Sequence, residues 1–296
     1  MKIGLIDVDG HNFPSLPLMK ISAWHKEQGD TVDWWNGFEH YDAAYMSKVF
    51  TDEYSPDTPE PYNADKVVKG GTGYGLENVL PEVIEHTYPD YSLYPKSSEA
   101  YGFLTRGCPR NCGFCVVTQK EGSKSVKVAD LSEFWRGQKQ IKLLDPNLLA
   151  SKDHENLLQQ LIDSKAWVDF TQGLDARLLT DGNISLLKRV KTKMVHFAWD
   201  SDAQSDTILA SLRKFKIETG IDERKARVYV LTNYNTDFNF DLYRVNKLRQ
   251  IGFDPYVMIY NKKNAPRKTR HLQRWCNNKR IFRKEHDFTN YDPKIG

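Results

Sequence analysis

Tyr101-Gly-Phe-Leu-Thr-Arg-Gly107 runs directly into Cys108-Pro-Arg-Asn-Cys112-Gly-Phe-Cys115, and this stretch decides which fold and chemistry to expect. The first half has the pattern of a short buried strand that ends in a glycine. The second half places three cysteines at C-x3-C-x2-C spacing in the following loop. Three thiolates on one short loop can hold three corners of a cubane iron–sulfur cluster. The fourth iron would then have no protein ligand and would be open to another molecule.

Other uses of clustered cysteines fit the chain less well. A structural zinc site normally takes four ligands in C-x2-4-C pairs, so Cys276 or a histidine would have to complete it. A ferredoxin-type carrier needs a fourth cysteine close by. Four cysteines in 296 residues, with no secretory leader at the start, favour a reducing cytosol over a disulfide framework. The spacing therefore favours a cluster with an open iron and leaves zinc as the alternative.

The cysteine loop, with the aromatic Phe114 before its last cysteine, resembles that of the radical S-adenosylmethionine (radical SAM) superfamily. The resemblance extends more weakly over about residues 100–262. It implies that Cys108, Cys112 and Cys115 bind one [4Fe–4S] cluster whose open iron binds S-adenosylmethionine. It further implies reductive cleavage to a 5′-deoxyadenosyl radical that abstracts a substrate hydrogen, with no catalytic residues beyond the cluster ligands. A flavodoxin- or ferredoxin-type protein would supply the electron.

The composition predicts a folded cytoplasmic protein. Hydrophobic residues make up 40% of the chain and aromatic residues 12%, which excludes a disordered protein. No apolar run approaches the roughly 20 residues that a membrane helix needs. We therefore expect no membrane association.

Downstream of the cysteines, apolar runs that predict strands alternate with segments of helical periodicity, which favours a parallel sheet or barrel. The predicted strands are 141–144, 167–170, 194–198, 227–231 and 256–260. The predicted helices are 153–164, 180–190, 205–215 and 237–251. Together with a strand at 101–106 these give six β/α units, which match the partial (β/α)6 TIM-type barrel of the radical SAM family.

The predicted fold class is thus α/β, with three parts along the chain. Residues 1–95 form a small Rossmann-like domain, residues 96–262 the partial barrel, and residues 263–296 a basic helical C-terminal extension. Loops at the carboxyl ends of strands carry the chemistry of α/β barrels, and the cysteines follow the first barrel strand as this rule requires.

The same rule nominates polar residues for binding S-adenosylmethionine. The backbone at Asp145 is the candidate contact to the methionine amino group, although the family's glycine pair is absent here. Gln172, Asp175 and Arg177 follow the next strand and suit a ribose or a carboxylate. Asp200 and Asn233 follow the next two strands and suit ribose hydroxyls and an adenine edge. Turn, helix-capping and surface-pair roles are the alternatives for all of them.

Residues 1–95 resemble a truncated cobalamin-binding domain of one radical SAM branch. The fragments that carry the resemblance are Asp9-Gly-His11, Ser47-Lys-Val49 and Gly70-Gly71, but Pro14 stands where the pattern has glycine and the intervals are short. His11 would be the cobalt ligand if cobalamin binds, and a loop histidine otherwise. The cluster at 70–75 suits either a phosphate-binding turn that opens a helix or a close-packed turn.

The C-terminal segment from Lys262 onward is rich in lysine and arginine, with Trp275, Phe282 and His271 interleaved, although the whole chain carries a net charge of only +3. This pattern suits either a nucleic-acid contact or a helix that closes the barrel.

Three functional hypotheses follow. The first is a radical SAM enzyme whose unidentified substrate is a nucleic acid. The second is a cobalamin-assisted methyltransferase or rearrangement enzyme that acts on a peptide or a small metabolite. The third is a zinc-stabilised binding module without enzymatic activity.

Overall fold

The computed structural model describes residues 1–10 and 13–294, which fold into two compact units. The first unit comprises residues 1–102 and 129–139, and the second comprises residues 103–128 and 140–296. The structure contains a four-stranded and a six-stranded parallel sheet, as the alternation of strand and helix patterns predicts.

The four-stranded sheet of the first unit has the order β2-β1-β3-β4. Its strands are β1 (Lys2–Asp7), β2 (Thr31–Trp34), β3 (Ala43–Ser47) and β4 (Val67–Gly70). Helix α1 (Leu16–Glu27) connects β1 to β2. Within the described residues no helix connects β2 to β3 or β3 to β4, so α1 is the connecting helix of this four-stranded parallel sheet.

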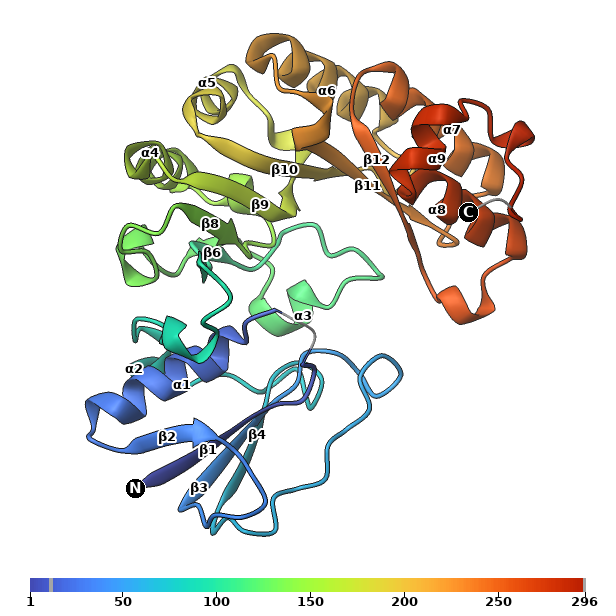
Figure 1. Cartoon of the computed structure of the whole chain (residues 1–296). Helices are drawn as coiled ribbons and strands as arrows, with labels where there is room; N and C mark the ends of the chain where they lie inside the picture. The colour runs from blue at the N-terminus through green and yellow to red at the C-terminus, as the bar shows by residue number, and fades with distance from the viewer. Residues whose placement is uncertain (11–12, 295–296) are drawn as a thin grey trace. The chain divides into compact units, whose positions relative to one another are not determined.

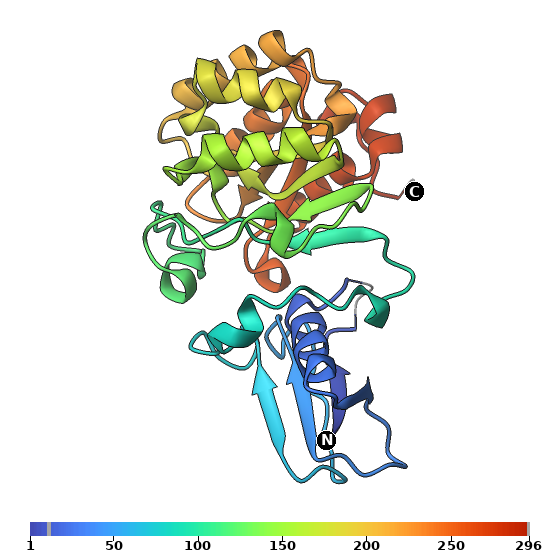
Figure 2. The same ribbon diagram turned by 90° about the vertical axis from the view of Figure 1, so that its left-hand side faces the viewer.

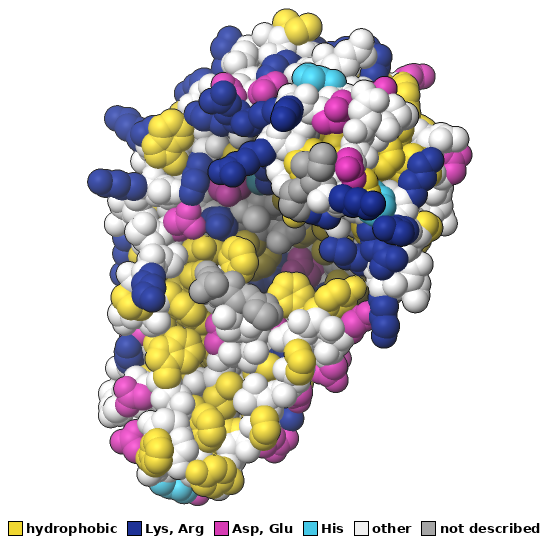
Figure 3. Space-filling view, turned by 45° about the vertical axis from the view of Figure 1, so that its right-hand side comes forward, with side chains coloured by type: hydrophobic (Ala, Val, Ile, Leu, Met, Phe, Trp, Pro, Cys, Tyr) yellow, Lys and Arg dark blue, Asp and Glu magenta, His cyan; other side chains and the backbone are white. Residues whose placement is uncertain are grey.

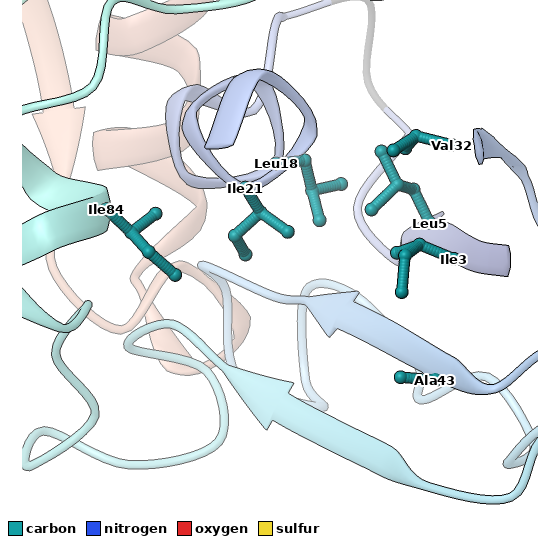
Figure 4. Packing of buried hydrophobic residues seen from close by; sticks show 7 residues of the cluster. All are labelled: Ile3, Leu5, Leu18, Ile21, Val32, Ala43 and Ile84. Atoms are coloured by element: carbon teal, nitrogen blue, oxygen red, sulfur yellow. The ribbon is translucent and has the colours of Figure 1, made fainter. Parts of the chain in front are cut away.

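The core of the first unit lies between α1 and one face of this sheet (Figure 4). Leu18 and Ile21 of α1 pack toward Ile3 and Leu5 of β1, and α2 (Glu82–Glu85) adds Ile84. Alternate residues of β1 point to opposite faces, which explains why Ile3 and Leu5 share this core.

The second sheet has the order β12-β11-β10-β9-β8-β5. Its strands are β5 (Glu99–Gly102), β8 (Gln140–Leu143), β9 (Trp167–Leu174), β10 (Thr192–Ala198), β11 (Ala226–Thr232) and β12 (Asp254–Ile259). Helices α4 (His154–Ser164), α5 (Asp181–Arg189), α6 (Ser205–Thr219) and α7 (Phe238–Gln250) alternate with β8 to β12. Helices α4, α5 and α6 lie side by side over one face of the sheet (Figures 1 and 2).

The predicted strand over 101–106 is wrong as a single element. The chain forms β5 up to Gly102 and then a separate two-residue strand, β6 (Thr105–Arg106), which pairs antiparallel with β7 (Val126–Lys127). The break has a tertiary cause, because the backbone N–H groups of Leu104 and Thr105 donate to the carboxylate of Asp145 instead of to a neighbouring strand.

The basic C-terminal segment forms α8 (Arg267–Asn277) and α9 (Lys279–Lys284). Leu272, Trp275 and Cys276 of α8 are buried with Val257 of β12 and Phe282 of α9. Helix α8 therefore covers β12 with its apolar face. Its charged residues lie on the other side, and lysine and arginine side chains are numerous on the surface of the second unit (Figure 3).

Candidate functional site

The three clustered cysteines lie in a loop whose two ends are joined by the β6–β7 ribbon. Gly107 at the neck has φ +86°, and a Cβ there would lie 2.1 Å from the carbonyl oxygen of Lys124. The N–H of Gly107 donates to the Glu121 carboxylate (3.2 Å), and that of Cys108 donates to the Gly122 carbonyl (3.1 Å). Only glycine fits this position, so Gly107 fixes where Cys108 enters the loop.

Within the loop the backbone turns tightly around the thiols. The Cys115 N–H donates to the Cys112 carbonyl (2.9 Å), and the hydroxyl of Thr118 in α3 (Val117–Glu121) donates to the Cys108 carbonyl (3.2 Å). All three thiols are free, and the Cys115 side chain is exposed. The loop is therefore held by its backbone and leaves the sulfur atoms available as ligands.

The thiols form one electrostatic group. Burial raises the pKa of the Cys112 thiol, and the charges of Cys115, Cys108 and Asp200 raise it further, while Arg177 lowers it. Ionising all three thiols is costly unless positive charge is added among them, as a cluster's iron atoms would do. The donor set of three adjacent thiols thus fits an iron–sulfur cluster.

In residues 1–10 and 13–294 no three His, Cys, Asp or Glu side chains converge on a point that would hold a single metal ion. A cubane places each thiolate on a different iron atom, so it needs a wider spacing of sulfur atoms than a single ion does.

Asn147, two residues after Asp145, contacts the first of the three thiols. Its side-chain N–H donates to Sγ of Cys108 (3.5 Å), and its backbone carbonyl accepts from the Ser125 hydroxyl (2.9 Å). The side chain is buried, and its Oδ1 has no hydrogen-bond partner among the described residues. A buried amide that donates to a ligand sulfur stabilises the thiolate and tunes the centre that it binds.

Asp145 lies at the end of β8 and uses its carboxylate inside the protein. The carboxylate accepts from the N–H groups of Leu104 and Thr105 and from the Thr105 hydroxyl (2.7 Å). Burial raises its pKa to about 6 although these hydrogen bonds lower it. The side chain supports the start of the β6–β7 ribbon, which leaves only the backbone there for a cofactor.

Gln172, Asp175 and Arg177 do not all follow the strand, because β9 is longer than the predicted 167–170. Strand β9 continues to Leu174, so Gln172 is an exposed strand residue. Asp175 then begins a short 3-10 helix and accepts from Nε (2.7 Å) and Nη2 (3.1 Å) of Arg177 and from Nε of Arg110. The polar run 171–173 resembles a loop locally, but it extends β9 along β10 with a register shift.

The Arg110–Asp175 ion pair connects the cysteine loop to the end of β9. Burial alone would raise the pKa of Asp175, but Arg177 and Arg110 outweigh it and hold that pKa below its usual value. Asp175 is therefore ionised, and it holds the guanidinium groups of Arg110 and Arg177, of which that of Arg177 acts electrostatically on the Cys112 thiol.

Asp200 and Asn233 follow β10 and β11. The Asp200 carboxylate accepts the N–H of Leu231 (3.1 Å), and burial raises its pKa. Asn233 has φ +62°, and its amide donates to the Tyr260 carbonyl (2.8 Å). The charges of Asp200 and Arg177 both act on the Cys112 thiol, so the structure brings these two predicted residues within electrostatic range of it.

An aromatic group covers part of the cysteine loop. The rings of Phe114 and Tyr234 meet edge to face at 5.3 Å, and Tyr234 meets Tyr260 at 4.9 Å. A Cβ on Gly113 would lie 2.6 Å from the Tyr234 hydroxyl. The aromatic residues at the ends of β11 and β12 were the only sequence signal for this contact.

The face of β9 and β10 opposite the helices is polar. His196 stacks on Tyr229 (5.1 Å), and its Nδ1 lies 3.0 Å from the Phe170 carbonyl and 3.6 Å from the Asp169 carboxylate. Burial lowers the pKa of His196, so the ring is neutral and Nδ1 carries the proton that it donates. Sequence reasoning missed this group because its residues alternate with core positions along three separate strands, β9, β10 and β11.

The cobalamin-like fragments of the first unit give a different picture. His11 lies outside the described residues. The Asp9 carboxylate accepts the N–H of Val49 (2.6 Å). No helix follows the glycine cluster directly: residues 71–74 form a turn in which a Cβ on Gly71 would lie 2.2 Å from the Lys48 carbonyl oxygen. The helix-opening interpretation of this cluster is wrong, and close packing of the backbone explains the glycine.

No family model matches the chain, and a comparison with curated proteins finds no match. Among solved structures, the chain is similar to that of Streptococcus suis SuiB bound to S-adenosylmethionine, with a TM-score of 0.44 and 14% sequence identity. The similarity covers 70% of this chain and 52% of SuiB, so the chain spans about half the length of that protein.

Among the described residues, no helix combines the length and the apolar character needed to cross a bilayer.

Proposed function

We propose that this chain is a radical SAM enzyme whose second unit is a partial (β/α)6 barrel. The observation that carries the proposal is the group of three free, electrostatically coupled thiols at C-x3-C-x2-C spacing. Cys108, Cys112 and Cys115 would hold one [4Fe–4S] cluster. When bound, the cluster would supply the electron that cleaves S-adenosylmethionine to a 5′-deoxyadenosyl radical.

The chain's own residues would orient the cofactor. Arg177 is held beside the thiols by Asp175 and suits a carboxylate, while the backbone at Asp145 suits an amino group. Gln172, Asp200 and Asn233 remain candidates for the ribose and the adenine. The neutral ring of His196 on the polar face of the sheet would face the substrate side. A flavodoxin- or ferredoxin-type protein would supply the electron.

Metal analysis of the anaerobically purified chain tests this assignment. The proposal predicts about four iron and four sulfide per chain after reconstitution. One zinc per chain, with no iron retained on gel filtration, would instead establish the zinc-stabilised module and exclude the enzyme.

Cobalamin assistance is a separate proposal for the first unit. Its support is the four-stranded parallel sheet, which is the architecture of a small nucleotide-type domain. Incubation with hydroxocobalamin followed by gel filtration should leave a corrin spectrum with the protein. A colourless protein fraction would exclude cobalamin and leave the cluster assignment unaffected.

A further inference from the structure

An open depression of about 650 Å³ lies on the second unit, away from the cysteine loop in the sequence. It is formed by α7, α8 and the segment that follows α9. The lining residues are Phe238, Asn239, Leu242, Arg267, Lys268, His271, Phe288, Thr289 and Tyr291. The set combines aromatic rings with cations and contains no carboxylate.

The aromatic residues of the depression pack against one another and against the core. The Phe288 ring packs against Phe238 at 5.5 Å, against Tyr291 at 6.1 Å and against the fully buried Trp275 at 5.4 Å. The Tyr291 hydroxyl is buried and has no hydrogen-bond partner among the described residues. A surface made of aromatic rings suits the flat face of a ligand ring.

The cationic part belongs to the beginning of α8. Arg267, Lys268 and His271 occupy its first two turns, and Pro266 before them offers no side-chain cap to the free N–H groups. The Lys268 ammonium lies 4.0 Å from the centroid of the Phe238 ring, and Nε of Arg267 donates to Nε2 of His271 (3.4 Å). The charges of Arg267 and Lys268 and the helix N-terminus together favour an anion.

In the part of the chain that the structure describes, no carboxylate forms an ion pair with Arg267 or Lys268. The carboxylates of Asp287 and Asp292 accept backbone N–H groups of Thr289 (2.9 Å) and Lys294 (2.8 Å). Asp241 is buried against Arg244. The depression therefore presents positive charge beside an aromatic surface.

We infer that this depression binds one nucleotide of a single-stranded nucleic acid. The base stacks on the Phe238 and Phe288 surface beside the Tyr291 ring, while its phosphate lies on Arg267, Lys268 and the first amides of α8. The exposed cations of α8 that flank the site, Arg270 and Arg274, would contact neighbouring phosphates. This assignment uses Phe238 and Phe288 for stacking, because the aromatic residues named from the sequence, Trp275 and Phe282, are buried in the core. It stands independently of the cluster.

The test is fluorescence anisotropy with a 5′-labelled single-stranded 12-nucleotide RNA and the full chain, prepared without iron, over a salt series. The variants are Arg267→Ala/Lys268→Ala and Tyr291→Phe. Arg213→Ala, an exposed arginine on α6, is the matched control. We expect the control to bind as the wild type does. The double variant should bind at least fivefold more weakly, with a salt slope smaller by about 1.4, since each phosphate contact on a single strand contributes about 0.7. Tyr291→Phe, which keeps the ring and removes only a buried hydroxyl, should bind as the wild type does.

Equal affinities of the double variant and the Arg213→Ala control would overturn the inference, as would binding that does not depend on salt. Adenosine monophosphate should displace the RNA only at a large molar excess, because it supplies one phosphate where the strand supplies several. Displacement at equimolar concentration would overturn the assignment to a strand. Because this experiment uses protein without a cluster, a lack of RNA binding would not bear on the separate prediction that the reconstituted chain forms 5′-deoxyadenosine.

Discussion

The polar side chains around the cysteine loop differ in whether they already have hydrogen-bond partners, and this separates the proposed cluster ligands from the residues that support them. Among the described residues none of the three thiols donates a hydrogen bond. The carboxylates of Asp145, Asp175 and Asp200, in contrast, all accept backbone or guanidinium N–H groups. Asn147 stands between these classes, since its amide donates to Sγ of Cys108.

Replacing Asn147 with alanine should make the reduction potential of the reconstituted cluster more negative by a few tens of millivolts. The amide N–H stabilises the more negative, reduced state of a thiolate-bound cluster, so its loss favours the oxidised state. A redox titration followed by electron paramagnetic resonance measures this potential. Asn156→Ala, an exposed residue on α4, is the control, and equal potentials for the two variants would show that the contact has no influence.

Asp145 should make the stability of the chain depend on pH. Its pKa is 3.8 ordinarily and about 6 in the fold, so the unfolded chain releases this proton at lower pH than the folded chain does. The stabilising contribution is complete below pH 3.8 and is lost as pH rises through 6. The difference corresponds to about 3 kcal/mol, at 1.36 kcal/mol for each pH unit.

Urea unfolding of the wild type and of Asp145→Asn between pH 4 and 7 checks this expectation. The stability of the wild type relative to the variant should decline across that interval, because asparagine does not titrate. A relative stability that rises with pH would mean that the hydrogen bonds from Leu104 and Thr105 outweigh burial.

Whole elements were largely predictable wherever apolar periodicity decides them. Strands β8 and β10 to β12 and helices α4, α5 and α7 begin and end within two residues of their predicted bounds, since their apolar residues recur at strand or helix spacing. The division of 101–106 into β5 and β6 was not predictable, because it depends on a carboxylate about 40 residues further along the chain. The Tyr234 contact to the cysteine loop is equally non-local.

Two glycines of the cysteine loop offer a matched comparison. Gly107 and Gly122 have φ +86° and +95°. A Cβ added to Gly107 would lie 2.1 Å from the carbonyl oxygen of Lys124, whereas a Cβ added to Gly122 would have no atom within 4 Å. Both alanine variants pay the cost of a positive φ, of about 1 kcal/mol. Gly107→Ala should in addition displace Cys108 and lower the iron bound per chain well below that of Gly122→Ala. Equal iron contents would show that the neck does not position the thiol.

Helix α8 should contribute to stability through its buried face alone. Leu272→Ala removes a fully buried side chain from the core around Trp275 and should lower the free energy of unfolding by about 2–5 kcal/mol. Arg270→Ala on the exposed side should change it by less than about 0.5 kcal/mol. Thermal and urea unfolding measure both, and a similar loss for the two variants would contradict the packing described for α8.

At the scale of the whole molecule, the chain combines a small four-stranded unit with a larger unit that holds every residue assigned to the thiol site. The sequence indicated both parallel sheets because each is built from repeated strand patterns. It could not name a substrate, because the polar face around His196 and the depression on α8 are assembled from residues that lie far apart in the sequence.

The measurement that tests the central proposal most directly is formation of 5′-deoxyadenosine by the reconstituted chain with S-adenosylmethionine and a strong reductant under anaerobic conditions. The wild type and Cys276→Ala, which removes only a buried core thiol, should both release 5′-deoxyadenosine. Cys112→Ala should release none. The account would be contradicted if a wild-type protein that carries about four iron atoms released no 5′-deoxyadenosine. It would also be contradicted if Cys112→Ala still released 5′-deoxyadenosine.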